Sequence, residues 1–464
     1  MYFFSLFFAL FQQGGSFSSL VKQTLQLCPC SPEKPWELVY YSDEIVPGQF
    51  LQTDSSRKIQ AVYVSIKEFG PITLSHEEAW LLLLAKRSSQ VNELEASMSQ
   101  VTGVLLDHLL NHNLVDPSST GFVVKDEHGT AHTIYFTLGM MLQDGGAHKQ
   151  VWSLKGDAGS KFCLFCNNLF TESSGIIAED NEQVLVATSW SLKDVKQATD
   201  EDVLSCARRL AEKKGTLSKA DYELWQQAVG MTFNPHSLLQ RDSLQRHLKP
   251  TKQFVHDYMH CFLVTGIFQT VLFLTLKALQ DDLQTDIYNS VATCLQLWKL
   301  PAGKAADLAS FFSKKRQKAN SLAKSFKCTA SEALALAPVF GYYLLTMVIP
   351  LNSCLKQCTC MLSLIDLIEM LQIVPLGLIT PATLQTACHK FISNSLEAGY
   401  KEHMGPKFHW VLHFPQHLAK HSCLPSCFVQ ERKHKMIKRL WVLNGIDCLC
   451  LCFFCWVLVF ALFV

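Results

Sequence analysis

The sequence predicts a mixed α+β protein in which helices dominate: strands with a helix come first, a long all-helical block follows, and a His-rich, basic segment comes last. Two early segments, 36–41 (WELVYY) and 59–66 (IQAVYVSI), are rich in β-branched and aromatic residues, as strands are. A third, 132–142 (HTIYFTLGMML), is apolar enough for a buried strand and stops at Gln143-Asp144-Gly145-Gly146. From about residue 200 to residue 400, apolar residues recur instead with the period of a helix.

The predicted helices fall in two places. Residues 75–113 follow the second predicted strand, with Ser75 as the expected N-cap and Glu77 and Glu78 in the first turn. Within the helical block, the clearest segments are 201–214, 254–280, 285–299, 303–324 and 330–348. Pro350, Pro375 and Pro381 punctuate the block, and no internal repeat is visible.

Composition narrows the function classes. The 464 residues are 48% hydrophobic and only 17% charged, against about 25% charged in an average soluble protein. A disordered or highly charged tail protein is therefore excluded. The net charge of +1 means that any nucleic-acid-binding surface must be local. Because no G-x-S-x-G, P-loop or Rossmann fingerprint occurs, the sequence does not favour a hydrolase or a nucleotide-binding protein.

Both ends of the chain are apolar. Residues 1–35 begin with MYFFSLFFALF, which has the length of a signal peptide but lacks a basic n-region and an A-x-A site. A buried segment and a misassigned start are the alternatives. Residues 446–464 include 17 uncharged positions, 448–464, behind a basic flank at 431–439. This length is at the lower limit for a membrane anchor, and a misread gene end is the alternative.

The 18 cysteines are scattered, which favours buried free thiols in a reducing compartment over a disulfide framework. Cys163 and Cys166 have the spacing of half a zinc site. His256 and His260 are four residues apart and would present two imidazoles on one helix face, which completes a candidate Zn²⁺ site. His236 and His247 are alternative ligands, and two unligated thiols in a tight loop are the alternative to a metal site.

Two other groups predict no metal site. Cys354, Cys358 and Cys360 are expected to be core thiols at a helix end. His409, His413, His417 and His421 recur every four residues, but Pro415 is expected to break the helix between them.

Two acidic residues stand at the ends of predicted strands. Asp43 ends the first strand, and Asp144 follows the buried third one. In an RNase H-like sheet, one catalytic acid lies on the first strand, a second lies at the end of a neighbouring strand, and a third comes from a later helix. Carboxylates held in this way bind two Mg²⁺ or Mn²⁺ ions about 3.5–4 Å apart and cleave phosphodiesters. Solvated turn acids are the alternative.

Four phrases, in order, resemble CACTA-type (En/Spm) transposases. The phrase LQDGGAHKQVWSLKGDAGSKFCLFC (142–166) resembles the family's strand-end Asp followed by a Gly turn and a Cys pair. The phrase FVHDYMHCFLVTGIF (254–268) is similar to its Asp-Pro-Met-His motif, with Tyr258 in place of Pro. The phrase YYSDEIVPGQF (40–50) resembles the segment of the first catalytic Asp. The last phrase, FHWVLHFPQHL…CFVQERKHKMIK (408–438), resembles the family's His-rich segment and the Glu-Arg motif that ends it. The resemblance covers about residues 36–440.

The resemblance implies a DDE/D transposase whose RNase H-like catalytic core is interrupted by a large all-α insertion. Residues 36–170 would be the first part of the core and would contain the Cys-x-x-Cys loop. Residues 171–400 would be the insertion. Residues 401–445 would be the last part of the core, which is His-rich and basic. Asp43 and Asp144 would be the first two acids. Glu431, 287 positions after Asp144 (431 − 144), would be the third ligand of the catalytic Mg²⁺ or Mn²⁺, with Glu369 and Asp257 as alternatives.

A transposase would bind the DNA of transposon ends in the nucleus, as a candidate homo-oligomer. The basic residues that could contact phosphates fall in two clusters. They are Lys314, Lys315, Arg316 and Lys318, and Arg432, Lys433 and Lys435. Each is also compatible with a solvated helix face. The second hypothesis is a catalytically dead descendant that is tethered to a membrane through residues 448–464 or acts through protein interactions.

Overall fold

The computed structural model describes residues 2–46, 58–111, 116–156, 159–170, 185–186, 190–298 and 307–434. The chain divides into two compact units. The first unit consists of Met1–Glu179, Lys196–His256 and Pro425–Val464, and the second of Asp180–Val195 and Asp257–Leu424. The prediction of a mixed α+β, helix-dominated protein is confirmed. Residues 196–256, which lie in the predicted insertion, belong to the first unit, and residues 401–424, which lie in the predicted last part of the core, belong to the second.

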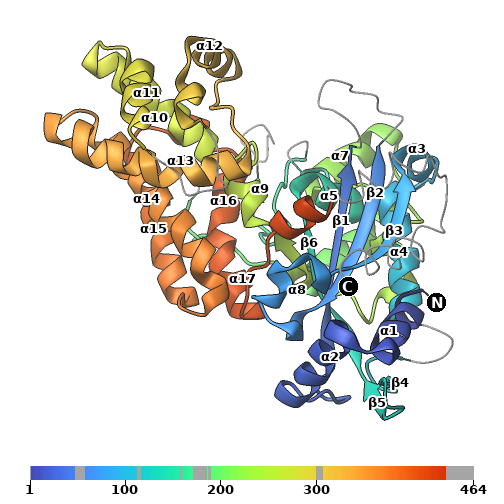
Figure 1. Ribbon diagram of the computed structural model, residues 1–464. Helices are drawn as coiled ribbons and strands as arrows, with labels where there is room; N and C mark the ends of the chain where they lie inside the picture. Colours follow the sequence, from blue (N-terminus) through green and yellow to red (C-terminus); the bar gives the residue numbers. More distant parts are fainter. Residues whose placement is uncertain are drawn as a thin grey trace. The chain divides into compact units, whose positions relative to one another are not determined.

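The first unit is built on a five-stranded sheet with the order β3-β2-β1-β6-β9 (Figure 1). Its strands are β1 (Trp36–Ile45), β2 (Ile59–Ile66), β3 (Leu81–Arg87), β6 (Phe136–Gln143) and β9 (Phe254–His256). The first three are antiparallel neighbours, whereas β6 runs parallel to β1 and β9 runs parallel to β6. All eight residues of β2 are buried. This explains why the strands read as nearly continuous apolar runs rather than as an alternating pattern.

The prediction of helix over residues 75–113 is wrong in its first half. Residues Leu81–Arg87 form β3, which pairs with β2, and helix begins only at α3 (Ser88–Asn92) and α4 (Ser97–Leu110). Ser75 does not cap a helix, since its hydroxyl donates to the carbonyl of Ile72. A leucine-rich run fits both a helix and a buried strand, and here the unpaired edge of β2 selects the strand.

Two further strand boundaries were mispredicted. The expected strand 132–142 is divided between β5 (Ala131–Ile134), which forms a hairpin with β4 (Phe122–Lys125), and β6. The expected helix at 254–280 starts instead as strand β9. Its three residues complete the parallel edge of the sheet by pairing with Met141, Leu142 and Gln143.

The N-terminal apolar run is folded into the first unit. It forms α1 (Tyr2–Gln13), and α2 (Gly15–Leu27) follows. Phe7 is fully buried, and its ring lies 5.9 Å from that of Phe136 and 5.8 Å from that of Phe122. Each such aromatic pair adds about 0.5–1.5 kcal/mol beyond the area buried. The described residues thus match the buried-segment alternative, whereas the apolar tail at 446–464 lies outside the described residues.

The remaining elements of the first unit connect and cover the sheet. They are α5 (Gly145–Val151), β7 (Leu169–Phe170), α6 (Asp200–Lys213), α7 (Lys219–Val229) and α8 (Pro250–Gln253). Helix α6 begins at a capping box in which Thr199 and Asp202 satisfy each other's backbone N–H groups. The two-residue strand β8 (Leu185–Val186) belongs to the second unit.

The second unit is helical in its described part from residue 257 to residue 424. Its helices are α9 (Tyr258–Phe262), α10 (Ile267–Leu283), α11 (Ile287–Gln296), α12 (Lys314–Ala323), α13 (Ala330–Tyr343), α14 (Leu355–Ile373), α15 (Pro381–Glu397), α16 (Pro406–Trp410) and α17 (Phe414–His421). Helices α14 and α15 pack as a hairpin. Among the described residues, three helical stretches are long and apolar enough to cross a membrane: Tyr258–Leu283, Ala330–Leu351 and Leu355–Leu376.

The cysteines agree with the expectation of a reduced protein. Among the described residues, no two cysteines form a disulfide. Cys358 and Cys360 lie buried in α14, as expected for core thiols, and burial raises the pKa of Cys358 to about 12. The thiols of this helix therefore stay protonated at neutral pH and pack as small apolar groups.

Candidate carboxylate centre

The parallel pair β1–β6 brings two of the predicted acids to the same edge of the sheet. In this pair Tyr41 is in register with Leu142. Asp43 lies two residues beyond Tyr41 and is still within β1, and Asp144 lies two residues beyond Leu142, directly after β6. Because parallel neighbours are about 4.8 Å apart, continuing the register puts the two acids side by side at the carboxyl ends of the strands, where ligands of open α/β sheets bind.

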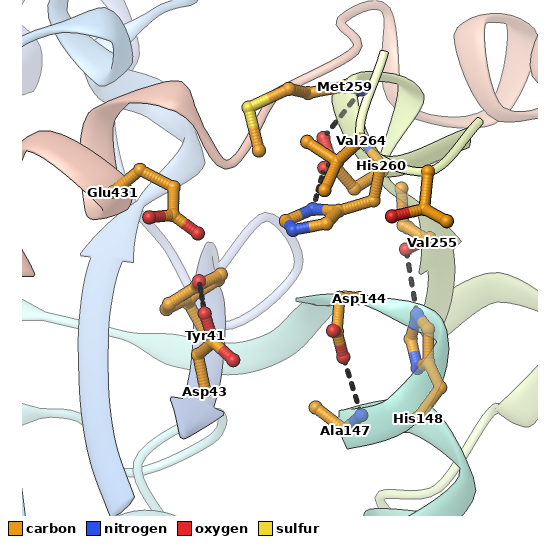
Figure 2. Close-up of polar contacts among 12 residues, drawn as sticks. Tyr41, Asp43, Asp144, Ala147, His148, Val255, Met259, His260, Val264 and Glu431 are labelled. Atoms are coloured by element: carbon orange, nitrogen blue, oxygen red, sulfur yellow. Dashed lines mark hydrogen bonds and ion pairs between the residues drawn. The ribbon is translucent and has the colours of Figure 1, made fainter. Parts of the chain in front are cut away.

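Local hydrogen bonds orient both carboxylates. Asp43 accepts from the Tyr41 hydroxyl at 2.8 Å and from the Glu44 backbone N–H at 2.7 Å. Asp144 is the N-cap of α5, and its Oδ1 accepts from the Ala147 N–H at 2.6 Å (Figure 2). The Asp144 side chain thereby satisfies one of the backbone N–H groups that the first turn of a helix leaves without an intrahelical partner.

The third predicted acid joins Asp43. Residues 428–434 are helical, and they carry Glu431 and His434 three positions apart on one face. One ligand atom each from Asp43, Glu431 and His434 lies within 4.8 Å of the other two. His434 Nδ1 is 3.9 Å from both Asp43 Oδ2 and Glu431 Oε2. Glu431, 388 positions after Asp43 (431 − 43), therefore lies beside the first strand.

Aromatic rings line the dry side of this group. His434 is buried and stacks on Tyr63 with ring centroids 5.7 Å apart. The Tyr41 ring lies 6.0 Å from His434 and 5.9 Å from Tyr63, so the three rings form one cluster. Burial, followed by the charges of Asp43 and Glu431, raises the pKa of Tyr41 and of Tyr63 well above the usual value. Both phenols therefore stay protonated, and Tyr41 remains a hydrogen-bond donor to Asp43.

His434 was not among the predicted site residues. The sequence ERKHK (431–435) could have indicated His434, because a histidine three residues after an acid in a helix lies on the same helix face as that acid. The alternative third acids lie in the second unit. Glu369 is exposed on α14, whereas Asp257 is buried and caps α9 by accepting from the Met259 and His260 N–H groups.

The predicted zinc ligands are distributed over both units. Cys163 and Cys166 are buried in one loop of the first unit, with their Sγ atoms within 4.8 Å of each other. The hydrogen bond with Cys163, reinforced by burial, raises the pKa of Cys166. His256 ends β9 beside this loop, since its ring lies 5.6 Å from that of Phe165. His260 belongs to the second unit, and its Nδ1 is 2.6 Å from Asp257 Oδ2.

The predicted DNA-binding residues have different surroundings. Lys314, Lys315 and Lys318 are exposed on α12. Arg316 of the same helix donates a hydrogen bond to the Lys327 carbonyl at 3.4 Å, and its guanidinium lies over the Phe311 ring in a cation–π contact. This cluster is available to a phosphate backbone. Lys435 lies outside the described residues.

The second basic cluster holds the C-terminal helix in place. The Arg432 guanidinium donates a hydrogen bond to the Ser75 carbonyl at 2.9 Å and forms an ion pair with the Glu77 carboxylate at 3.3 Å. Lys433 is buried, and its Nζ donates to the carbonyls of Glu77 at 2.8 Å and Trp80 at 2.6 Å. Lys433 therefore fixes Glu431 next to the sheet, a placement that does not suit the predicted phosphate contact. The sequence alone could not distinguish this lysine from its exposed neighbours.

We expect the stability contributed by Lys433 to rise with pH. Burial lowers the pKa of Lys433 from 10.5 to about 8, so between these values the unfolded chain binds the proton that the folded chain has released. The free energy of unfolding of the wild type should therefore increase, relative to Lys433→Met, by up to about 3 kcal/mol from pH 7.5 to 10.5. Urea unfolding at both pH values measures this difference, and an unchanged difference would contradict the buried ammonium.

Comparison with known proteins does not extend this description. A scan against protein-family models and a search of the curated proteins both find no match to this chain.

Proposed function

We propose that this protein is a CACTA-like DDE/D transposase, or a descendant of one, which cleaves and transfers DNA strands in the nucleus with Mg²⁺ or Mn²⁺. The observation that carries the proposal is the meeting of Asp43 and Glu431 at the sheet edge where Asp144 also lies. Asp43 is near the end of β1 and Asp144 directly follows its parallel neighbour β6, and Glu431 reaches Asp43 from a helix at the far end of the chain.

The sheet topology supports an RNase H-like core. Counting along the chain, β6 is the fourth strand of the sheet, and it lies next to β1 as an RNase H-like arrangement requires. The sheet is complete at β9, and Glu431 follows only after the helical residues of the second unit. An insertion between the fifth strand and the last acid explains the long separation of Asp144 from Glu431.

The donor set fits hard divalent cations. Carboxylate oxygens from Asp43, Asp144 and Glu431 suit Mg²⁺ and Mn²⁺. When bound, such ions polarise the scissile phosphate and activate the attacking oxygen. The Tyr41 hydroxyl and the α5 N-terminus hold two of the carboxylates in place, and the buried rings of Tyr63 and His434 exclude water from one side.

The test is nicking of supercoiled DNA by the purified full chain. We expect nicking in Mg²⁺ or Mn²⁺ and none in the presence of a chelator. A chain that binds DNA but does not nick it under any divalent cation would be consistent with a catalytically dead descendant.

A membrane-tethered or protein-interaction protein is the second candidate, because the second unit exposes apolar side chains. Tyr342, Leu345, Met347 and Leu351 are each more than half exposed over one short stretch. Carbonate extraction of cells that express the full chain separates the two candidates. Pelleting with membranes favours tethering, and recovery in the soluble nuclear fraction favours the transposase.

A further inference from the structure

Four buried histidines follow one another along residues 406–421 of the second unit. Helix α16, a 3₁₀ turn at Val411–His413 and α17 are contiguous. Pro415 does not separate them, because it occupies the first turn of α17, where its missing N–H is tolerated. The break that the sequence predicted is therefore absent from this described segment, and residues four apart share a face. The histidines are His409, His413, His417 and His421.

Two of the imidazoles point their ring nitrogens at each other. His409 Nε2 is 3.0 Å from His413 Nε2, and both residues are fully buried. The Oε1 atom of Gln416 lies 2.9 Å from His413 Nδ1. An amide oxygen only accepts, so His413 Nδ1 carries the proton and the lone pair of the neutral ring is on Nε2, facing His409.

This is the arrangement of two metal ligands with an orienting partner. Zinc–nitrogen bonds of about 2.0–2.1 Å in a tetrahedral site separate two ligand nitrogens by roughly 3.3 Å, only a few tenths of an ångström more than the separation here. Metal-binding histidines donate their other N–H to an oxygen that fixes the ring, as His413 does to Gln416. A buried pair of neutral imidazoles suits Zn²⁺ and disfavours Mg²⁺, which prefers oxygen ligands.

We propose that His409 and His413 bind a Zn²⁺ ion through their Nε2 atoms, with Gln416 as the positioning residue. The pair supplies two of the four ligands of a tetrahedral ion. The site is separate from the carboxylate centre and does not rest on the transposase proposal. The competing interpretation is an N–H···N hydrogen bond between the two imidazoles, which needs no metal.

The experiment is a Zn²⁺ titration of the metal-stripped full chain against a chromophoric chelator. We expect His409→Gln and His413→Gln to lose one equivalent of tightly bound Zn²⁺, with affinity at least about 100-fold weaker. Gln416→Ala keeps both rings and should weaken binding about 10- to 100-fold. His421→Gln removes another buried histidine of the same segment and is the matched control, with wild-type binding expected.

A second readout covers variants that fold poorly. Zn²⁺ that binds only the folded chain raises its melting temperature, so the wild type and His421→Gln should gain stability on Zn²⁺ addition and Gln416→Ala should gain less. Wild-type affinity in both His409→Gln and His413→Gln, or no tight binding by the wild type, would overturn the proposal and leave the imidazole hydrogen bond.

Discussion

Asp43→Asn, Asp144→Asn and Glu431→Gln are each expected to reduce Mg²⁺-dependent DNA nicking by about 100-fold or more. The amides keep the shape of the side chains but remove a negative charge from the group that holds the cations. Losing several kcal/mol of transition-state charge stabilisation corresponds to at least two decades in rate. Initial rates of nicking by the full chain at saturating Mg²⁺ measure the effect.

Glu369→Gln is the matched control for the third acid. It makes the same chemical change at an exposed position of α14 and should leave nicking unchanged. Loss of nicking in Glu369→Gln together with full activity in Glu431→Gln would reject Glu431 as the third acid. Equal activity in all variants would mean that the acids near the sheet do not carry the reaction.

His434→Phe is expected to weaken Mn²⁺ binding by at least about tenfold. Phenylalanine retains the stacking on Tyr63 but removes the Nδ1 atom that lies 3.9 Å from Asp43 and Glu431. Imidazole nitrogen is a better ligand for transition metals than for Mg²⁺, so Mg²⁺ affinity should fall less. Mn²⁺ electron paramagnetic resonance, with Mg²⁺ competition, measures both affinities without relying on catalysis.

An exposed histidine of the same unit serves as control here. His236→Ala should bind Mn²⁺ as the wild type does, since its ring pairs only at the surface, with Glu95 at 3.3 Å. If His434→Phe also retains wild-type Mn²⁺ affinity, His434 is a packing residue of the carboxylate centre and the acids alone hold the cation.

Local pattern was sufficient for several elements. The run 59–66 forms β2 with the expected bounds, and the first strand begins at Trp36 as expected. Asp43 and Asp144 were identified from the turn-forming residues that follow two apolar runs. The helical period also located α6 and α13 to within one residue at their N-terminal ends. These features depend on neighbours in sequence, which a pattern records directly.

Features that depend on distant partners could not be predicted in this way. Leu81–Arg87 is a strand only because β2 has a free edge, and Phe254–His256 is a strand only because β6 does. Lys433 looks like an exposed basic residue until its ammonium meets the Glu77 and Trp80 carbonyls. Pro415 looks like a helix breaker until it is seen in the first turn of α17.

The sequence by itself therefore determined the mixed α+β class, the two strand-end acids and the length of chain that separates them from Glu431. The tertiary structure decided which late acid reaches Asp43, that His434 accompanies it, and that His409 faces His413. The physical reason is the distance along the chain over which each interaction acts. Backbone preference and apolar period act over a few residues, whereas a metal-capable group is assembled by strand pairing and side-chain packing between segments hundreds of residues apart.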